Sequence, residues 1–318
     1  MARQQRSSRS RSRSSRPGSR RRKSSSSTWK FIMTALLVVT LIVAVSAYRH
    51  SHSSSSQTSP FSRDVTAASA ESRQQGNQVS STAGHFNDLE LVRYADSSRA
   101  SRAIRKDYTG FSLSFNPENG TADWVGWELL RSETDGASSR SDKFWADTSV
   151  AGSPTPNDYR NSGYDKGHLC PAADQKWSPE AMNDCFVMTN MTPQLHALNN
   201  GAWKTLEKKE RLWAQRDSAL VIVAGPIYAD SDTKRIGDSG VRVPSSFYKV
   251  LLAPYVSEPR AIAFIYPNMT APGNMANYVT TVDEVERLTG LDFFYNLPDD
   301  IENRVEANSS FTTWDTSR

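Results

Sequence analysis

The sequence predicts an α+β fold: a mixed, largely antiparallel sheet with helices packed on it. One observation is a series of short apolar or alternating segments bounded by turn residues, which is the pattern of β-strands. The other is a set of segments with helix-start and helix-stop signals that interrupt those strands. No internal repeat is visible, so a repeat architecture is not expected.

Five segments are predicted as strands: residues 110–115, 123–130, 219–224, 246–252 and 261–266. The first two are separated by Asn-Pro-Glu-Asn-Gly, which indicates a strand, a turn and a second strand. The third is an apolar run ending at Gly225-Pro226, which is typical of a buried central strand.

Three segments are predicted as helices: residues 179–184, residues 199–216 and the stretch from Thr281 to Gly290. The first has a serine cap followed by proline at the first helical position. The last has a Thr-x-x-Glu capping box and the expected stop glycine. Together the elements predict one folded domain, assigned to residues 85–318, which is long enough for one sizeable core.

The first 84 residues are predicted to tether this domain to a membrane. Residues 1–30 are a basic, Arg- and Ser-rich tail, and residues 31–48 carry no charge. As a helix, those 18 residues would span about 27 Å, close to the thickness of a bilayer's hydrocarbon core. Basic residues on the N-terminal side place the tail in the cytoplasm and the domain outside, with residues 49–84 as a flexible linker.

Two other interpretations of the N-terminus remain open. Val45-Ser-Ala47 resembles a signal-peptidase site, and cleavage near Ala47 would give a secreted protein. The Arg-Ser alternation of residues 6–16 is similar to an RNA-associated nuclear tail, which the hydrophobic segment directly behind it disfavours.

The charge balance excludes a general attraction of the folded part to nucleic acid. The whole chain has a net charge of +4, but residues 1–30 hold 11 of its 38 basic residues and no acidic ones. Residues 31–318 therefore carry 27 basic against 34 acidic residues, a net charge of −7. Binding to nucleic acid must come from a local basic cleft.

Cys170 and Cys185 are the chain's two cysteines. They cannot make a disulfide framework, and two alternatives stay open: one bridge in an oxidising compartment, or two buried thiols.

The strongest functional signal consists of three short motifs: Asp165-Lys166-Gly167-His168, Asn190-Met-Thr-Pro-Gln194 and Asn199-Asn-Gly-Ala-Trp203-Lys-Thr-Leu-Glu207. Hydrolysis of a phosphodiester needs a base near pH 7, a cation to neutralise charge on phosphorus, and help for the departing oxygen. Histidine suits the first task, and an asparagine amide with substrate phosphate suits Mg²⁺. Each motif alone is weak, but their order and spacing together favour an active site.

The local context of these motifs predicts their geometry. Gly167 should let the backbone approach a neighbour closely beside His168. Asn199 is expected at the start of its helix, with its side chain facing a ligand. Glu207, two helical turns further on, should act through waters of a metal ion.

On these motifs the chain resembles the DNA/RNA non-specific endonucleases of the ββα-metal class, a family that includes mitochondrial endonuclease G and secreted bacterial nucleases. The resemblance runs from about residue 108 to residue 300 and implies a ββα-metal active site. It implies DNA and RNA as substrates, 5′-phosphate products and Mg²⁺ as cofactor, with Mn²⁺ as a substitute.

The resemblance also implies residue roles. His168 would be the general base and Asn199 the direct protein ligand of Mg²⁺, while Glu207 and Asn190 would orient metal-bound water and its surroundings. An upstream arginine contacts the phosphate in this family. Arg140 is the first candidate for this role by position and Arg131 is the second.

Asp165 and Lys166 are assigned to substrate binding. Lys166 departs from the family pattern, which has arginine there. Lysine keeps the charge but loses the planar two-pronged donor that suits phosphate, so a reduced rate or altered substrate preference is expected.

The sequence thus predicts a membrane-tethered, extracytoplasmic, metal-dependent endonuclease with little sequence preference. The rival hypothesis is a catalytically inactive nucleic-acid-binding domain at the surface, in which Lys166 is a sign of decay. A homodimer is retained as a further partner hypothesis.

Overall fold

The computed structural model describes residues 92–316 of the chain. The predicted basic tail, membrane anchor and linker, and residues 85–91 of the predicted domain, lie outside the described residues. Within residues 92–316, no helix has the length and apolar character needed to cross a membrane.

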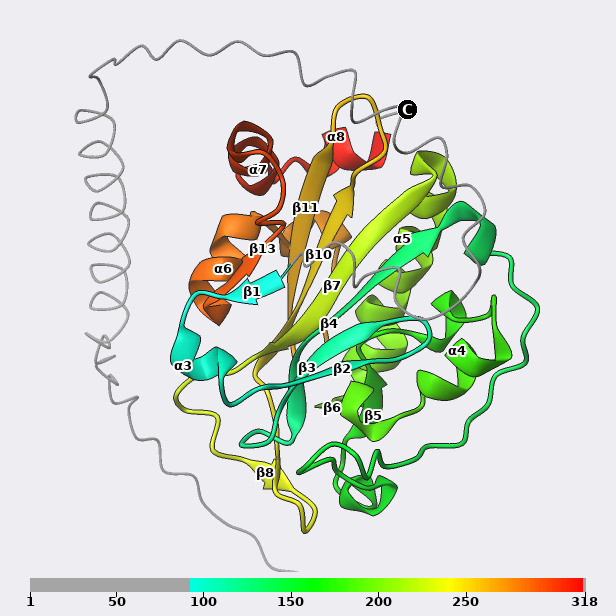
Figure 1. Cartoon of the computed structure of the whole chain (residues 1–318), viewed down its shortest axis with the longest axis vertical. Coiled ribbons are helices and arrows are strands. Elements are labelled where there is room, and N and C mark those ends of the chain that lie inside the picture. Colours follow the sequence, from blue (N-terminus) through cyan, green and yellow to red (C-terminus); the bar gives the residue numbers. More distant parts are fainter. Residues whose placement is uncertain (1–91, 317–318) are drawn as a thin grey trace, which may run out of the picture. The chain divides into compact units, whose positions relative to one another are not determined.

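A seven-stranded sheet forms the centre of the described part (Figure 1), and every pair of neighbouring strands in it is antiparallel. From one edge to the other the strands are β12 (Val279–Thr280), β11 (Arg260–Pro267), β10 (Ser246–Ala253), β7 (Ala219–Ile227), β4 (Thr121–Leu130), β3 (Ser112–Asn116) and β2 (Ile104–Asp107). All five predicted strands are present, as β3, β4, β7, β10 and β11. The α+β prediction is confirmed.

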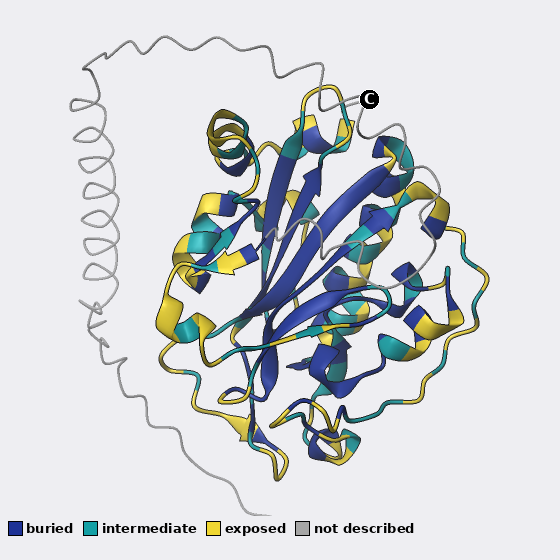
Figure 2. Ribbon diagram, viewed as in Figure 1, coloured by how far each residue is buried: buried dark blue, intermediate teal, exposed yellow. Residues whose placement is uncertain are grey.

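Helices cover both faces of the sheet, which explains why its central strands are continuous apolar runs in the sequence. Along β7, Leu220 and Ile222 pack in one hydrophobic core, whereas Val221 and Val223 pack in the other. The first core includes residues of α5 (Lys204–Asp217), and the second includes residues of α6 (Val282–Thr289) and α7 (Asp299–Glu306). Figure 2 shows the central strands of the sheet as buried and the outer helix surfaces as exposed.

The predicted caps of α4 and α6 are confirmed. In α4 (Pro179–Asp184), the Ser178 hydroxyl accepts hydrogen bonds from the backbone N–H groups of residues 180 and 181. The Thr281 hydroxyl caps α6, and Gly290 ends it in the left-handed conformation with φ of 64°. Such a φ favours glycine because a Cβ atom clashes there.

A two-stranded antiparallel ribbon lies outside the main sheet and was not predicted as strands. It pairs β5 (Asp165–His168) with β6 (Met191–Gln194). A π-helical segment, η6 (Leu198–Trp203), follows and leads into α5. The predicted start of an α-helix at Asn199 is therefore wrong, since Asn199 lies within the π-helical segment. The non-helical backbone of Gly201 (φ −109°, ψ −112°) separates this residue from α5.

Short elements complete the described part. They are the strands β1 (Val92–Tyr94), β8 (Arg235–Ile236), β9 (Val241–Arg242) and β13 (Leu291–Phe293), the helices α3 (Ser97–Ala100) and α8 (Phe311–Thr316), and the 3₁₀ turns η2 (Arg131–Glu133), η3 (Pro156–Tyr159), η4 (Ala172–Asp174), η5 (Met188–Asn190) and η7 (Met275–Tyr278).

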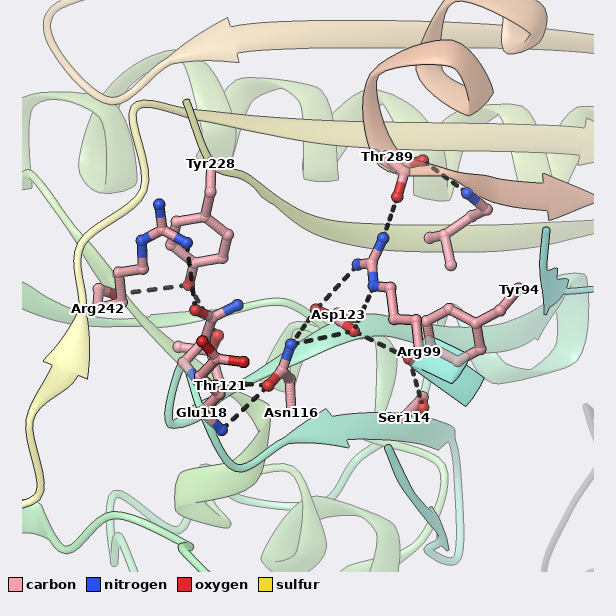
Figure 3. Close-up of polar contacts among 12 residues, drawn as sticks. Tyr94, Arg99, Ser114, Asn116, Glu118, Thr121, Asp123, Tyr228, Arg242 and Thr289 are labelled. Carbon is pink, nitrogen blue, oxygen red and sulfur yellow. Dashed lines mark hydrogen bonds and ion pairs between the residues drawn. The ribbon is translucent and has the colours of Figure 1, made fainter. Parts of the chain in front are cut away.

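One polar cluster fastens α3 to the sheet (Figure 3). The Arg99 guanidinium forms an ion pair of 3.1 Å with Asp123 on β4 and donates a hydrogen bond to the carbonyl of Thr289 at the end of α6. Tyr94 of β1 donates to the same carboxylate at 3.0 Å. This cluster joins β1, α3 and α6 to the main sheet.

Cys170 and Cys185 are free, buried thiols, so of the two alternatives the structure has the unbridged one. The Cys185 thiol donates to the carbonyl of Met182 at 3.1 Å, and the Cys170 sulfur accepts from the Gln175 side-chain amide at 3.1 Å.

Candidate active site

The β5–β6 ribbon positions the first motif. Gly167 pairs with Thr192 and His168 pairs with Met191 across the two strands. A Cβ atom on Gly167 would lie 2.6 Å from the Cβ of Gln194 and 3.0 Å from the carbonyl oxygen of Thr192. The expected close backbone approach at Gly167 is therefore present, and a larger residue would push the strands apart.

Beside the ribbon, a cleft of about 720 Å³ lies between β5 and the start of α5. It brings together His168, Asn199 and Glu207 from the predicted set, with Arg140, Asp165 and Lys166. Its basic lining residues are Arg140, Lys166, Lys204, Lys208 and Arg211, against the acidic Asp165 and Glu207. The cleft is thus locally basic in a domain whose overall charge is negative, as expected for phosphate binding.

The His168 imidazole is half-buried and lies between two aromatic rings, with centroid distances of 5.7 Å to Phe144 and 5.0 Å to Phe186. Its Nε2 atom is buried and has no hydrogen-bond partner among the described residues. Burial, and next the positive charge of Arg140, lower the pKa of His168 from 6.5 to about 3. The imidazole is therefore neutral at pH 7 and has a lone pair available for a proton.

We expect His168 to stay neutral when the substrate-free protein is acidified to pH 5, because its folded-state pKa lies below that pH. Two-dimensional NMR of histidine-labelled protein, assigned with His168→Gln, measures this directly. Since the unfolded chain binds a proton near pH 6.5 and the folded one does not, this residue contributes a loss of stability as the pH falls below 6.5. A His168 resonance with its midpoint near pH 6.5 would contradict the expectation.

The Asn199 amide is oriented by a carboxylate. Its Nδ2 donates to Asp165 Oδ2 at 2.8 Å, and the same oxygen lies 2.8 Å from Nδ1 of His196. Because the nitrogen faces Asp165, the amide oxygen is the free atom, and it has no hydrogen-bond partner within residues 92–316. An unpartnered amide oxygen in a cleft that also holds the Glu207 carboxylate is the donor set that a hard divalent cation prefers.

Glu207 lies on the cleft side of α5, and its pKa is raised to about 7 by burial and by the neighbouring carboxylates of Glu210 and Asp174, against the opposing charge of Lys249. Three basic residues that were not predicted as site residues share its helix face: Lys204, Lys208 and Arg211. The sequence contains the pattern that would have identified these residues, because positions 204, 207, 208 and 211 follow the i, i+3, i+4, i+7 spacing of one helix face. The Arg211 guanidinium is held 2.7 Å from the buried carboxylate of Asp174.

The two candidate phosphate-binding arginines lie in different places. Arg140 lines the cleft, 4.9 Å above the ring of Phe186. Arg131 donates to the carbonyl of Arg216 and the hydroxyl of Ser218 at the far end of α5, and it does not line the cleft. Position therefore favours Arg140 over Arg131.

Asn190 is fully buried behind the ribbon and does not line the cleft. Its side chain accepts from the backbone N–H of Cys170 at 2.9 Å and donates to the carbonyls of Cys170 and Cys185 at 2.9 and 2.8 Å. These backbone groups take up its polar atoms, and its predicted effect on metal-bound water and the surrounding network stays a prediction. Asn190 fixes the chain just after His168.

Comparisons with known proteins identify the family of this chain. The family model described as DNA/RNA non-specific endonuclease matches residues 90–300. The chain belongs to this family. The nuclease of Nostoc sp. is 34% identical over 210 residues, covering 62% of this chain and 75% of that protein. Human mitochondrial endonuclease G is 32% identical over 225 residues, covering 65% of this chain and 74% of that protein.

Similarity to a solved structure supports the fold as well. A crystal structure of the EndoG/EndoGI complex matches with a TM-score of 0.58 and 27% identity, covering 61% of this chain and 86% of that one. The protein is thus a DNA/RNA non-specific endonuclease, a metal-dependent class of nuclease.

This endonuclease has a second polar cleft, of about 320 Å³, lined by Arg99, Arg102 and Arg242. Of its two carboxylates, Asp123 and Glu118, Asp123 is bound by Arg99 and by the Asn116 amide at 3.2 Å. No histidine lines this cleft. The first cleft groups a neutral histidine with oxygen donors suited to a metal ion, and it is therefore the candidate active site.

Proposed function

We propose that the chain is a membrane-tethered, extracytoplasmic, Mg²⁺-dependent endonuclease that cuts DNA and RNA with little sequence preference. The observation that carries the catalytic part is the Asn199 amide, turned by Asp165 so that its oxygen is free, in one basic cleft with His168 and Glu207. The family membership supports the substrate class.

In this proposal, neutral His168 accepts a proton from the water that attacks phosphorus. Arg140 and Lys166 bind the phosphate oxygens and neutralise the charge that grows on them in the transition state. Binding of an anionic phosphate beside His168 also offsets the effect of Arg140 and raises the pKa of the imidazole, so that it becomes a stronger base once substrate is present.

Asn199 would hold the Mg²⁺ ion directly, and Glu207 would hold it through water. When bound, the ion supplies charge neutralisation at the phosphate and the departing 3′ oxygen. Asp165, assigned to substrate binding from the sequence, acts in this proposal as the group that orients Asn199, since a carboxylate itself repels phosphate.

Replacement of Asp165 by asparagine should raise the Mg²⁺ concentration needed for half-maximal cleavage by about 10- to 100-fold, the usual cost of losing a partner that orients a metal ligand. Metal titrations of the initial cleavage rate measure this. Asp142→Asn is the matched control, because Asp142 is an exposed partner of Arg140 and does not line the cleft. An unchanged Mg²⁺ requirement in Asp165→Asn would show that Asn199 needs no orienting group.

The central experiment is cleavage of plasmid DNA and of a structured RNA by the full chain purified in detergent, with Mg²⁺ and with chelator. We expect Mg²⁺-dependent nicking of both substrates and 5′-phosphate ends. Binding of both nucleic acids without any cleavage in Mg²⁺ or Mn²⁺ would instead establish the inactive binding domain, for which the intact set His168, Asn199 and Glu207 gives no support.

The Lys166→Arg variant should cleave nucleic acid about 3- to 10-fold faster than the parent protein, because a second charge-assisted hydrogen bond to phosphate contributes about 1 kcal/mol. Lys166 lies 4.8 Å above the ring of Phe144, a position in which a guanidinium can also stack. Steady-state kinetics of Lys166→Arg measure the effect, with Lys166→Met as the variant expected to be slower than the parent. An equal or lower rate for Lys166→Arg would mean that lysine does not limit this enzyme.

The location rests on residues 1–48, through the charge-free segment 31–48 and the basic tail before it. External protease applied to intact cells that express the full chain should remove the nuclease domain while leaving a tag at residue 1 protected. Release of the domain into the medium with a new N-terminus near residue 48 would favour the cleaved-signal alternative. Self-association stays a prediction that sedimentation of the full chain tests.

A further inference from the structure

We propose a second divalent-cation site, specific for Ca²⁺, formed by Asp283, Glu286 and Glu306. We call it the C-terminal carboxylate site. It lies apart from the catalytic cleft, since none of its three residues lines that cleft. The inference does not depend on the proposed function.

The fold brings these three carboxylates together from two helices. Asp283 and Glu286 are three residues apart on α6 and therefore share a helix face, and Glu306 is the last residue of α7. One ligand oxygen from each side chain lies within 4.8 Å of the others. Two oxygens on opposite sides of a Ca²⁺ ion are about 4.6–5.2 Å apart, twice the usual bond length, so one ion can reach all three.

Glu306 supplies the observation that points to a ligand. Only 7% of this residue is exposed, and its Oε1 atom is buried without a hydrogen-bond partner. Its side chain ends among the other two carboxylates. A buried carboxylate oxygen without a partner is costly, and a bound cation removes that cost.

Nearby charges leave the cluster without compensation. Among the ion pairs of residues 92–316, none joins an arginine or lysine to Asp283, Glu286 or Glu306. The negative charges of Glu302 and Asp292 also act on Glu306 and add to the repulsion within the cluster. The basic residues of α6 and α7, Arg287 and Arg304, are paired with Glu284 and Glu258. Arg93 is likewise paired with Asp292 at 2.7 Å.

Charge and size favour Ca²⁺ over Mg²⁺. Ca²⁺ accepts several carboxylates at 2.3–2.6 Å with flexible geometry, whereas Mg²⁺ needs shorter bonds and keeps most of its waters. Glu286 has one oxygen fixed by the backbone N–H of Phe293 at 2.7 Å, which leaves its other oxygen for the ion. A Ca²⁺ ion at this place would fasten α7 to α6 over the face of the sheet opposite α5 (Figure 1).

The test uses the full chain in detergent, with Asn199→Ala as the background so that binding in the catalytic cleft does not contribute. Thermal unfolding is followed in chelator and in CaCl₂. At a Ca²⁺ concentration 100-fold above the dissociation constant, the unfolding midpoint should rise by about 5–10 °C. The Glu306→Gln variant should lose most of that rise. So should a separate variant, Asp283→Asn, in which the exposed ligand of the three is changed.

Glu302→Gln is the matched control. It removes a negative charge one helical turn before Glu306 but none of the three ligands, so it should keep the Ca²⁺-induced rise. Each variant is compared with itself in chelator, which separates ion binding from any change in basal stability. The inference is overturned if CaCl₂ gives no rise in the background protein, or an equal rise in Glu306→Gln and Asp283→Asn.

Discussion

Replacement of His168 by alanine should lower kcat by about 10²- to 10⁴-fold, the range that a positioned general base contributes. The imidazole is neutral and borders the cleft, and the other lining groups that can accept a proton are carboxylates or His196. The carboxylate of Asp165 is already hydrogen-bonded to Asn199. Loss of His168 therefore removes the proton acceptor without removing the groups that bind phosphate.

Single-turnover cleavage of a labelled duplex measures the effect, and fluorescence anisotropy in chelator measures binding. Affinity for the duplex should change little, because Arg140 and Lys166 remain. His196→Ala is the matched control, since this histidine also lines the cleft but its ring is largely exposed and hydrogen-bonded to Asp165. Cleavage by His168→Ala at the parent's rate would exclude His168 as the base.

The elements with strong local signals were predictable from sequence. The five long strands were marked by apolar runs between turn residues, and α4 and α6 by their caps. The β5–β6 ribbon was not, because Asp-Lys-Gly-His has no apolar alternation and is extended only through its pairing with residues 191–194. Its strand character comes from a contact between segments that are distant in sequence.

The candidate site also has features that the sequence predicts and features that it does not. Motif order predicted that His168, Asn199 and Glu207 share one cleft, and they do. Sequence could not show that Asn190 points into the protein, since motif spacing carries no information on which backbone groups a side chain meets. The basic face of α5 was readable from its periodicity, but its exposure to the cleft depends on how η6 turns at Gly201.

Lys249 was another residue that sequence left unexplained, and its replacement by methionine should destabilise the fold by about 3–5 kcal/mol. Lys249 lies in the middle of β10 and is fully buried, as is its partner Glu210 on α5, at an Nζ–Oε2 distance of 2.8 Å. Its ammonium lies 4.8 Å from the Trp203 ring centroid. Without it, Glu210 is left as a buried carboxylate with no cation paired to it, and that desolvation cost dominates.

Urea unfolding of Lys249→Met and of Lys249→Met/Glu210→Met measures two contributions to the free energy of unfolding. One is the contribution of the ion pair, and the other is the cost of burying the unpaired Glu210 carboxylate. The double variant should recover most of the lost stability, because apolar side chains of similar volume replace a buried pair at little net cost. Burial already raises the pKa of Glu210, so the loss in the single variant should be smaller at pH 5 than at pH 8, where the stranded carboxylate must ionise. Equal loss in the single and double variants would mean that Lys249 stabilises β10 through its contacts with Trp203 and Trp127, and that α5 is held against the sheet by apolar packing alone.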